Sequence, residues 1–225
     1  NRDPRLAATV LYNGVNWGNG IINVLKGQRD NPQGNANATP TGYYTRKYIP
    51  EVILNNNHTG SNYRNWIIIR YAEILLSYAE ALNNLTGPHT VELDGQPYTM
   101  SRDKEEIKKA FNQVRYRAGL PGLTANQLNS TPEVQKQIER ERMVEFLWEN
   151  RRFYDVRRWG IYEETEQEPI RGMNPDGATK ETYYQRVIPS SSSFLTRVVD
   201  KRSVWVPIPR NEMRRLPSLD QNPGY

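Results

Sequence analysis

The sequence predicts a mainly α-helical protein in which helical hairpins alternate with long, irregular, loop-rich regions and a few short strands. Apolar residues recur at three- and four-residue steps over several segments between residues 63 and 159, which is typical of amphipathic helices. Before and after these segments, Asn, Gly, Pro and Tyr interrupt every apolar run, so only short extended pieces are expected there.

Composition narrows the class of protein. A chain of 225 residues can bury a sizeable core, as one large domain or two small ones. Fourteen tyrosines and five tryptophans against four phenylalanines favour half-buried rings with one polar edge in water. The net charge is +5, but arginines and glutamates alternate over residues 139–152, which argues against a nucleic-acid-binding patch.

Several other features exclude particular sites. The chain has no cysteine, so disulfides, thiolate zinc sites and cysteine nucleophiles are excluded. No apolar run is long enough to span a bilayer, and we expect no signal peptide in the first residues of the given sequence. The first residue is Asn1 rather than an initiator methionine, so we expect a processed or cut piece of a longer protein.

Residues 1–62 are expected to be irregular, with extended pieces at 6–12 and 44–49 and exposed loop tips at 16–20 and 31–34. A first helix is predicted over 63–85, closed by Gly87-Pro88. Its predicted inward face consists of Trp66, Ile67, Tyr71, Ile74, Leu75, Tyr78, Ala79 and Leu82. A hairpin-like excursion is expected around Asp94-Gly95.

A second helix is predicted over 102–118, ending at Gly119 in a left-handed conformation. Its apolar stripe consists of Ile107, Ala110, Phe111, Val114 and Ala118. Thr131 is the expected N-cap of a third helix, because Pro132 follows it at the first helical position. That helix should cover 132–149, with an inward face made of Val134, Ile138, Met143, Phe146 and Leu147.

A short fourth helix is expected over 151–159, stopped by Gly160. Helical hairpins of this size are similar to tetratricopeptide-type stacks, although no strict repeat is visible. From residue 161 onward the chain is again irregular. Short strands are expected at 195–199 and 203–206 on either side of an Asp200-Lys201 turn, followed by one helical turn at 210–215 and an extended tail.

Six segments in order resemble the SusD/RagB family of outer-membrane nutrient-binding lipoproteins. They are Asp3-Pro-Arg-Leu6, Thr41-Gly-Tyr-Tyr-Thr-Arg-Lys-Tyr48, Arg70-Tyr-Ala-Glu-Ile-Leu-Leu-Ser-Tyr-Ala-Glu-Ala-Leu82, Asn112-Gln-Val-Arg-Tyr-Arg-Ala-Gly-Leu-Pro121, residues 139–160, and the ending Trp205-Val-Pro-Ile-Pro209 with Pro217-Ser-Leu-Asp-Gln-Asn-Pro-Gly-Tyr225. Each motif alone is weak, whereas six in order, from the first residues to the last, are specific.

The resemblance implies that residues 1–225 form the C-terminal portion of a SusD/RagB-type domain, whose N-terminal half, signal peptide and lipidated cysteine are absent from this chain. It implies a fold of tetratricopeptide-like helix pairs that support a loop-rich region. It also implies a place on the outer-membrane cell surface of a Gram-negative bacterium, anchored through that N-terminal lipid. There the protein would cover a SusC-like TonB-dependent transporter.

Candidate ligand-binding residues lie in the N-terminal loops. Sugar recognition needs flat aromatic faces against pyranose C–H groups, with amides and hydroxyls around the rim. The residues with that chemistry are Trp17, Tyr12, Asn13, Asn16, Asn19, Tyr43 and Tyr44. The alternative is that these rings cover the helices and that the asparagines serve turns.

The helical arginines and carboxylates also have two interpretations. We expect Arg151, Arg152 and Arg157 to form structural ion pairs with Glu145, Glu149 and Asp155, and Trp66, Trp148 and Trp159 to be packing residues. In the alternative, two of the carboxylates would act as the acid and base of a glycosidase. His58 and His89 stand alone in polar loops, so no metal site, catalytic residue or cofactor is predicted.

The leading hypothesis is therefore a non-enzymatic surface protein that captures oligosaccharides and passes them to a SusC-like transporter. Two alternatives stay open, a peptide-binding lid of the same kind of transporter and a transporter-docking scaffold without a ligand of its own.

Overall fold

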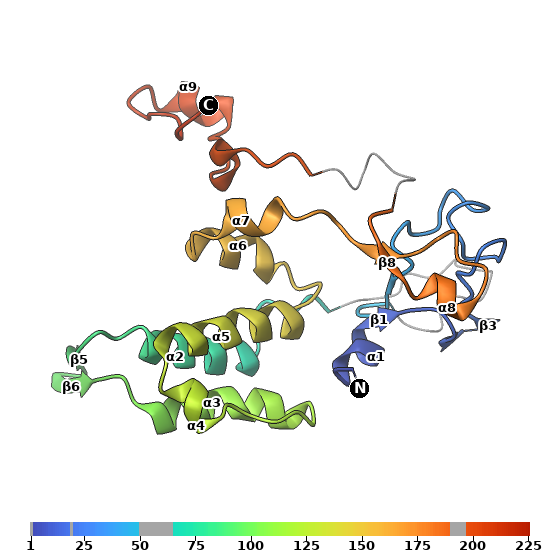
Figure 1. Cartoon of the computed structure of the whole chain (residues 1–225). Coiled ribbons are helices and arrows are strands. Elements are labelled where there is room, and N and C mark those ends of the chain that lie inside the picture. The colour runs from blue at the N-terminus through green and yellow to red at the C-terminus, as the bar shows by residue number, and fades with distance from the viewer. Residues whose placement is uncertain (1, 19, 50–64, 190–196) are drawn as a thin grey trace. The chain divides into compact units, whose positions relative to one another are not determined.

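The computed structural model describes residues 2–18, 20–49, 65–189 and 197–225 and confirms a mainly helical chain (Figure 1). The chain forms two compact units, here called the helical unit and the loop unit. The helical unit comprises Asn1–Val10 and Thr45–Arg152, and the loop unit comprises Leu11–Tyr44 and Phe153–Tyr225. The boundaries between the units fall within β1 (Val10–Leu11), β4 (Tyr44–Thr45) and α6 (Arg151–Arg158).

The helical unit is built on a helix pair that packs against a third helix. α2 (Tyr71–Asn83) leads to an excursion from which α3 (Lys104–Arg117) returns, and α5 (Thr131–Glu145) packs on α2 (Figure 1). The short α4 (Ala125–Leu128), which the periodicity did not predict, precedes α5. The core side chains include Leu76, Ala79, Leu82, Ile107, Phe111, Val134, Ile138 and Phe146.

The ends of these helices follow local chemistry. The Asp103 carboxylate accepts hydrogen bonds from the backbone N–H groups of Glu105 and Glu106 at the start of α3, and Gly119 ends α3 with φ of +70° as predicted. The N-cap of α5 is Ser130, not Thr131, because the Ser130 hydroxyl accepts the bond from Glu133 N. α2 is shorter than predicted, since the described residues 65–70 are not helical and β-branched Ile67, Ile68 and Ile69 precede it.

The predicted inward faces of the helices are only partly correct. Ala79 and Leu82 of α2 are buried, but Trp66, Tyr71, Ile74 and Tyr78 are exposed. Met143 of α5 is exposed too, whereas Glu141 and Glu145 are buried. α2 carries apolar residues on more than one side, and α3 and α5 cover only part of its surface.

The excursion between α2 and α3 is the predicted hairpin. It consists of β5 (His89–Leu93) and β6 (Gln96–Met100), paired antiparallel with Val91 opposite Tyr98. Asp94 and Gly95 both have positive φ, at 51° and 73°, which is the conformation that a two-residue type I′ turn requires.

The structure of the first residues differs from the extended piece expected there. α1 (Arg5–Thr9) occupies most of the stretch predicted as extended at 6–12, and only β1 follows it as strand. Pro4 has φ of −57°, and the Asp3 carboxylate accepts a hydrogen bond from Arg5 N at 2.9 Å, which together start the helix. In the stretch expected to be extended at 44–49, only β4 is a strand.

One part of the loop unit has a small core of its own. β2 (Asn16–Trp17) pairs with β3 (Gly20–Ile21), and β7 (Gly172–Met173) pairs with β8 (Arg186–Val187) near α8 (Lys180–Tyr183). Val24, Met173 and Tyr183 form the core. The fully buried Asn31 amide donates to the carbonyl oxygens of Val24 and Pro175, both at 2.9 Å, and thereby joins two distant segments.

The other part of the loop unit contains α6, α7 (Tyr162–Glu166), the 3₁₀ helix η3 (Lys201–Val204) and α9 (Arg210–Arg215). The strand expected at 203–206 is wrong, because the Asp200 carboxylate caps η3 there. Residues 197–199 form no strand, and 195–196 lie outside the described residues. The helices over 151–159 and 210–215 are confirmed. No helix in the described residues combines the length and apolarity needed to cross a bilayer.

A row of buried glutamates organises the helical unit. Glu141, Glu145 and Glu149 are four residues apart, so they lie along one side of α5 and the turn that follows it, and each is less than 5% exposed. We call them the glutamate ladder. An unpaired buried carboxylate is costly, so each member needs a cation.

The cations of the ladder come from segments far apart in the sequence. Arg5 bridges Glu141 and Glu145 at 2.6 and 2.7 Å, and Arg115 reaches Glu141 at 3.0 Å. The remaining pairs are Arg70 with Glu145 and Glu149, Arg117 with Glu145, and Lys47 with Glu149. The Arg70 guanidinium also lies 4.7 Å from the centre of the Phe146 ring, which joins the ladder to the apolar core.

We expect Glu145→Gln to lower the free energy of unfolding by about 3 kcal/mol, because it removes the shared partner of three arginines from a buried site. Urea denaturation followed by circular dichroism measures the change. Glu139→Gln on the same helix is the matched control, since that carboxylate accepts a bond from the neutral Gln135 amide, and it should change stability by less than about 0.5 kcal/mol. Equal losses in the two variants would contradict a special role for the ladder.

The ladder also predicts that acid lowers the free energy of unfolding. Burial alone raises the pKa of Glu145 and Glu149, but hydrogen bonds from Arg70, with Arg5 and Lys47 respectively, outweigh it and bring each pKa below the ordinary value of 4.5. At a pH between the lowered pKa values and 4.5, the unfolded chain therefore binds more protons than the folded chain. The stabilisation from these two carboxylates is complete above pH 4.5 and is lost as the pH falls through their lowered pKa values. Urea titrations between pH 7 and pH 3 should show this loss, with a shallower decline in Glu145→Gln than in Glu139→Gln.

Candidate functional site

Two of the predicted ligand-binding residues, Asn16 and Trp17, form β2 of the β2–β3 hairpin in the loop unit. Trp17 pairs with Gly20 across the hairpin, and only 7% of its surface is exposed. Asn16, its neighbour, is exposed, whereas Asn19 lies outside the described residues. The buried position of Trp17 agrees with the packing alternative, and contact between Trp17 and a ligand stays a prediction.

Asn13 and Tyr12 precede this hairpin. The Asn13 side chain is buried and its amide oxygen accepts a hydrogen bond from Val24 N at 3.2 Å, while its backbone carbonyl accepts one from the Tyr184 hydroxyl at 3.3 Å. Asn13 thus serves the loop structure. Tyr12 is half-buried, so part of its surface is accessible from solvent.

Tyr43 and Tyr44 pack against the Val24, Met173 and Tyr183 core and are both half-buried. The Tyr44 hydroxyl donates to the Asp30 carbonyl at 2.9 Å, and burial raises the pKa of this hydroxyl. Tyr44 is therefore tied into the loop. Among the predicted residues that the structure describes, Tyr12, Asn16 and Tyr43 combine accessible surface with the chemistry that sugar rings require.

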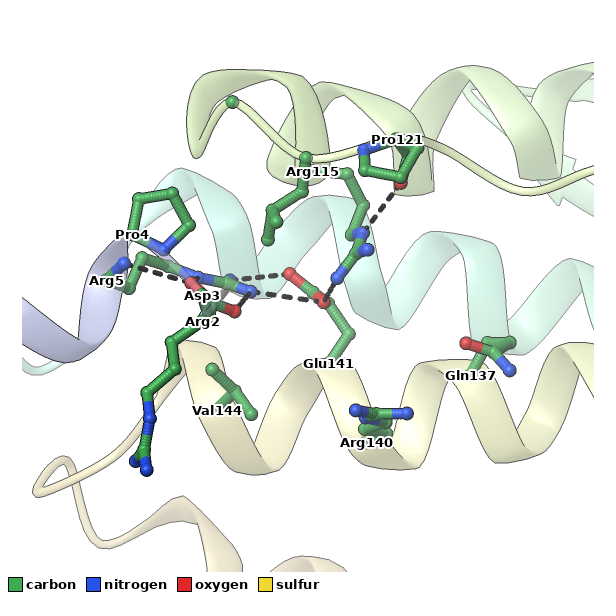
Figure 2. A pocket seen from close by; sticks show the side chains of 12 residues that line it. Arg2, Asp3, Pro4, Arg5, Arg115, Pro121, Gln137, Arg140, Glu141 and Val144 are labelled. Carbon is green, nitrogen blue, oxygen red and sulfur yellow. Dashed lines mark hydrogen bonds and ion pairs between the residues drawn. The ribbon is translucent and has the colours of Figure 1, made fainter.

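The helical unit contains a separate pocket that the sequence did not predict (Figure 2). Its volume is about 640 Å³, and it lies between the start of the chain, the end of α3 and the middle of α5. The lining residues are Arg2, Asp3, Pro4, Arg5, Arg115, Gly119, Leu120, Pro121, Gln137, Arg140, Glu141 and Val144.

One wall of the pocket is a chain of ion pairs that begins at Asp3 (Figure 2). Arg5 bonds Asp3 at 2.7 Å and Glu141 at 2.6 Å, and Arg115 bonds the other oxygen of Glu141 at 3.0 Å and the Pro121 carbonyl at 2.9 Å. Hydrogen bonds from Arg5 outweigh desolvation and lower the pKa of Asp3, so this carboxylate stays ionised at neutral pH.

Chemically, this pocket suits a polar or anionic group more than a stacked pyranose ring. Four arginines line it against two carboxylates, and Arg2 and Arg140 are exposed. None of its lining residues is aromatic, so it lacks the flat face that sugar stacking uses. Its residues lie up to 142 positions apart in the chain, which explains why motif spacing did not reveal it.

The helical carboxylates are in ion pairs, as expected, but mostly with other partners. Glu145 and Glu149 belong to the ladder, Asp155 bonds Arg158 at 2.9 Å, and Arg151 bonds Glu73 at 2.8 Å. The Arg157 guanidinium lies over the Phe153 ring and donates to the Ser203 and Val204 carbonyls. We expected arginines of α6 to form ion pairs with Glu145 and Glu149, but Arg151, Arg157 and Arg158 contact other partners.

Two of the predicted packing tryptophans differ from expectation. Trp66 and Trp148 are each about half exposed, and Trp66 stacks on Tyr48 with ring centres 5.6 Å apart. His89 is exposed in β5, and His58 lies outside the described residues. Within the described part of the chain, no three His, Cys, Asp or Glu side chains gather as metal ligands would.

Comparison with known proteins assigns the chain to a family. The sequence profile of the SusD family matches residues 1–225. SusD-like protein P2 from Formosa agariphila is 26% identical over 185 residues, which are 80% of this chain and 30% of that protein. The first curated relative is thus more than three times as long as the region that it shares with this chain.

Comparison with solved structures points to the same family. A SusD-like protein from Bacteroides fragilis is 31% identical with a TM-score of 0.73, over 100% of this chain and 39% of the other. A SusD superfamily protein from Bacteroides vulgatus, 22% identical with a TM-score of 0.60, shares the fold over 100% of this chain and 40% of its own. The profile match over all residues, together with these relatives, shows that the chain belongs to the SusD family.

Proposed function

We propose that this chain is part of a cell-surface protein that captures oligosaccharides and passes them to a SusC-like TonB-dependent transporter in the outer membrane of a Gram-negative bacterium. The observation that carries the proposal is the SusD-family match along the entire chain. Because the chain corresponds to less than half of its relatives, attachment through an N-terminal lipid anchor belongs to the same proposal.

The loop unit supplies side chains suited to such a ligand. Tyr12 and Tyr43 are half-buried, so part of each residue is accessible from solvent, and the amide of Asn16 can both donate and accept hydrogen bonds. Trp17 is buried within the β2–β3 hairpin, so we assign it a supporting role in this proposal. Partly wet contacts of this kind bind moderately, which suits a protein that must release its ligand.

We further propose that capture proceeds without cleavage of the glycan. A glycosidase needs one carboxylic acid with a raised pKa beside an ionised partner. The pKa values of Glu145 and Glu149 are instead lowered, and their oxygens are occupied by Arg70, Arg5, Arg117 and Lys47. These two carboxylates are therefore unsuited to general acid catalysis.

Calorimetry of the full-length protein against panels of neutral oligosaccharides, anionic oligosaccharides and peptides tests the proposal. We expect heat with at least one glycan, and a roughly tenfold weaker Kd in Asn16→Ala and Tyr12→Ala, which corresponds to about 1.4 kcal/mol. Asn16 is exposed, so its variant should fold normally. Tyr98→Ala is the control, since its ring is exposed on the β5–β6 hairpin of the other unit, and it should bind as wild type.

Three results would overturn the proposal. Heat with peptides alone identifies a peptide-binding lid, and no heat with any panel member identifies a scaffold without its own ligand. Shortened products in the glycan samples after incubation identify an enzyme. If glycans bind but Asn16→Ala and Tyr12→Ala bind like Tyr98→Ala, the function holds and the assignment of these loop residues is wrong.

A further inference from the structure

The arginine-lined pocket of the helical unit carries more positive charge than its own carboxylates neutralise (Figure 2). Its lining combines four arginines with Asp3 and Glu141, which leaves an excess of two positive charges. Arg5 does not supply this excess, because each nitrogen of its guanidinium donates to Asp3, Glu141 or Glu145. The excess therefore belongs to the other arginines.

Arg2 and Arg140 carry the charge that the pocket leaves unpaired. Both are exposed, and neither forms an ion pair or a side-chain hydrogen bond with another residue in the described part of the chain. A helical ion pair with Arg140 would require an acid three or four positions away on α5. The residues at those positions are Lys136, Gln137, Met143 and Val144. The helix thus supplies no carboxylate for Arg140.

Arg115 adds further donors from the wall of the pocket. Its Nε donates to the Pro121 carbonyl at 2.9 Å and its Nη1 to Glu141 at 3.0 Å, whereas its Nη2 donates to none of the described residues. These two bonds fix the plane of the guanidinium, and the side chain is only 24% exposed. A guanidinium held in this way is already oriented for an oxyanion and loses little freedom on binding one.

The size and the rest of the lining favour an oxyanion attached to a carbon skeleton. Pockets for small organic molecules measure about 300–1,000 Å³, and this one measures about 640 Å³. Pro4, Leu120 and Val144 offer apolar contacts to the skeleton. The planar fork of a guanidinium matches the oxygens of a carboxylate or sulfate, which it can bind through two hydrogen bonds.

The simplest alternative is that the free arginines are merely solvated. Solvation accounts for an exposed Arg2 or Arg140 taken singly. It does not explain why both line the same concavity as the unused Nη2 of Arg115, since like charges that converge repel one another. A concave surface of one sign also concentrates counter-ions. The arrangement is that of a site for a negatively charged group.

We propose that this pocket binds the sulfate or carboxylate group of a small organic acid, such as an acidic sugar. Arg2 and Arg140 bind the oxygens from the rim, and Nη2 of Arg115 binds them from the wall. The inference goes beyond the proposed function, because the pocket lies in the helical unit and the candidate glycan-binding residues lie in the loop unit. Either site can fail without the other.

Calorimetry of the full-length protein tests this site with four probes, namely glucuronate, glucose 6-sulfate, neutral glucose and inorganic sulfate. Arg140→Gln and Arg2→Gln each remove one charge from an exposed side chain, so circular dichroism should show both variants folded. Lys136→Gln is the matched control, because it removes the same charge from an exposed position on the same helix that does not line the pocket. Asn16→Ala, in the loop unit, is the second control.

We expect heat with glucuronate or glucose 6-sulfate and none with glucose. The Kd for the acidic sugar should weaken at least about tenfold in Arg140→Gln and in Arg2→Gln, as the loss of a charge-assisted hydrogen bond requires, and less than about twofold in Lys136→Gln and Asn16→Ala.

Three results would overturn the proposal. No heat with either acidic sugar means that the pocket does not take an organic acid. Heat with inorganic sulfate alone identifies an adventitious ion only. Equal losses in Arg140→Gln and Lys136→Gln place the bound acid elsewhere, held by the general charge of the protein. None of these results bears on glycan binding by the loop unit, which Asn16→Ala tests separately.

Discussion

The helical unit depends on a buried row of three carboxylates that must be neutralised where they lie. Removing Glu141, Glu145 and Glu149 from water is unfavourable unless cations and hydrogen bonds replace the lost hydration. Because five cations from four separate segments converge on the row, the ladder determines where the chain start, the entry to α2 and the end of α3 must lie. The apolar core supplies most of the driving force, while these pairs specify one arrangement of the segments.

The charged residues of the ladder lie in the segments that resemble the SusD family. Arg5, Lys47, Arg70, Arg115 and Arg117 each lie in one of the family-like motifs before residue 122, and the glutamates lie in the motif that follows. These motifs therefore contain the ion pairs that hold the helical unit together. All of the ligand-binding candidates belong to the loop unit, and family membership by itself identifies no nutrient.

The structure clarifies why some elements were predictable and others were not. α3, the β5–β6 hairpin and α9 follow from local signals such as an N-cap, an Asp-Gly turn or a proline before a helical turn. The stretch 6–12 was misread because four residues of helix and two of strand are too short for periodicity to distinguish. The exposure of Tyr71, Ile74 and Tyr78 was also missed, since periodicity shows which residues share a face and not what covers it.

By itself, then, the sequence determined the fold class, the order of the main helices and the family, because each depends on interactions between residues close in the chain or on motifs in fixed order. Tertiary structure alone decided the partners of the buried glutamates, the arginine-lined pocket and the burial of Trp17. The ion pairs of the ladder join residues up to 140 positions apart, and the lining of the pocket spans residues 2–144. The physical reason is that burial and charge pairing are properties of the assembled chain, and many arginines could have satisfied each carboxylate before the helices packed.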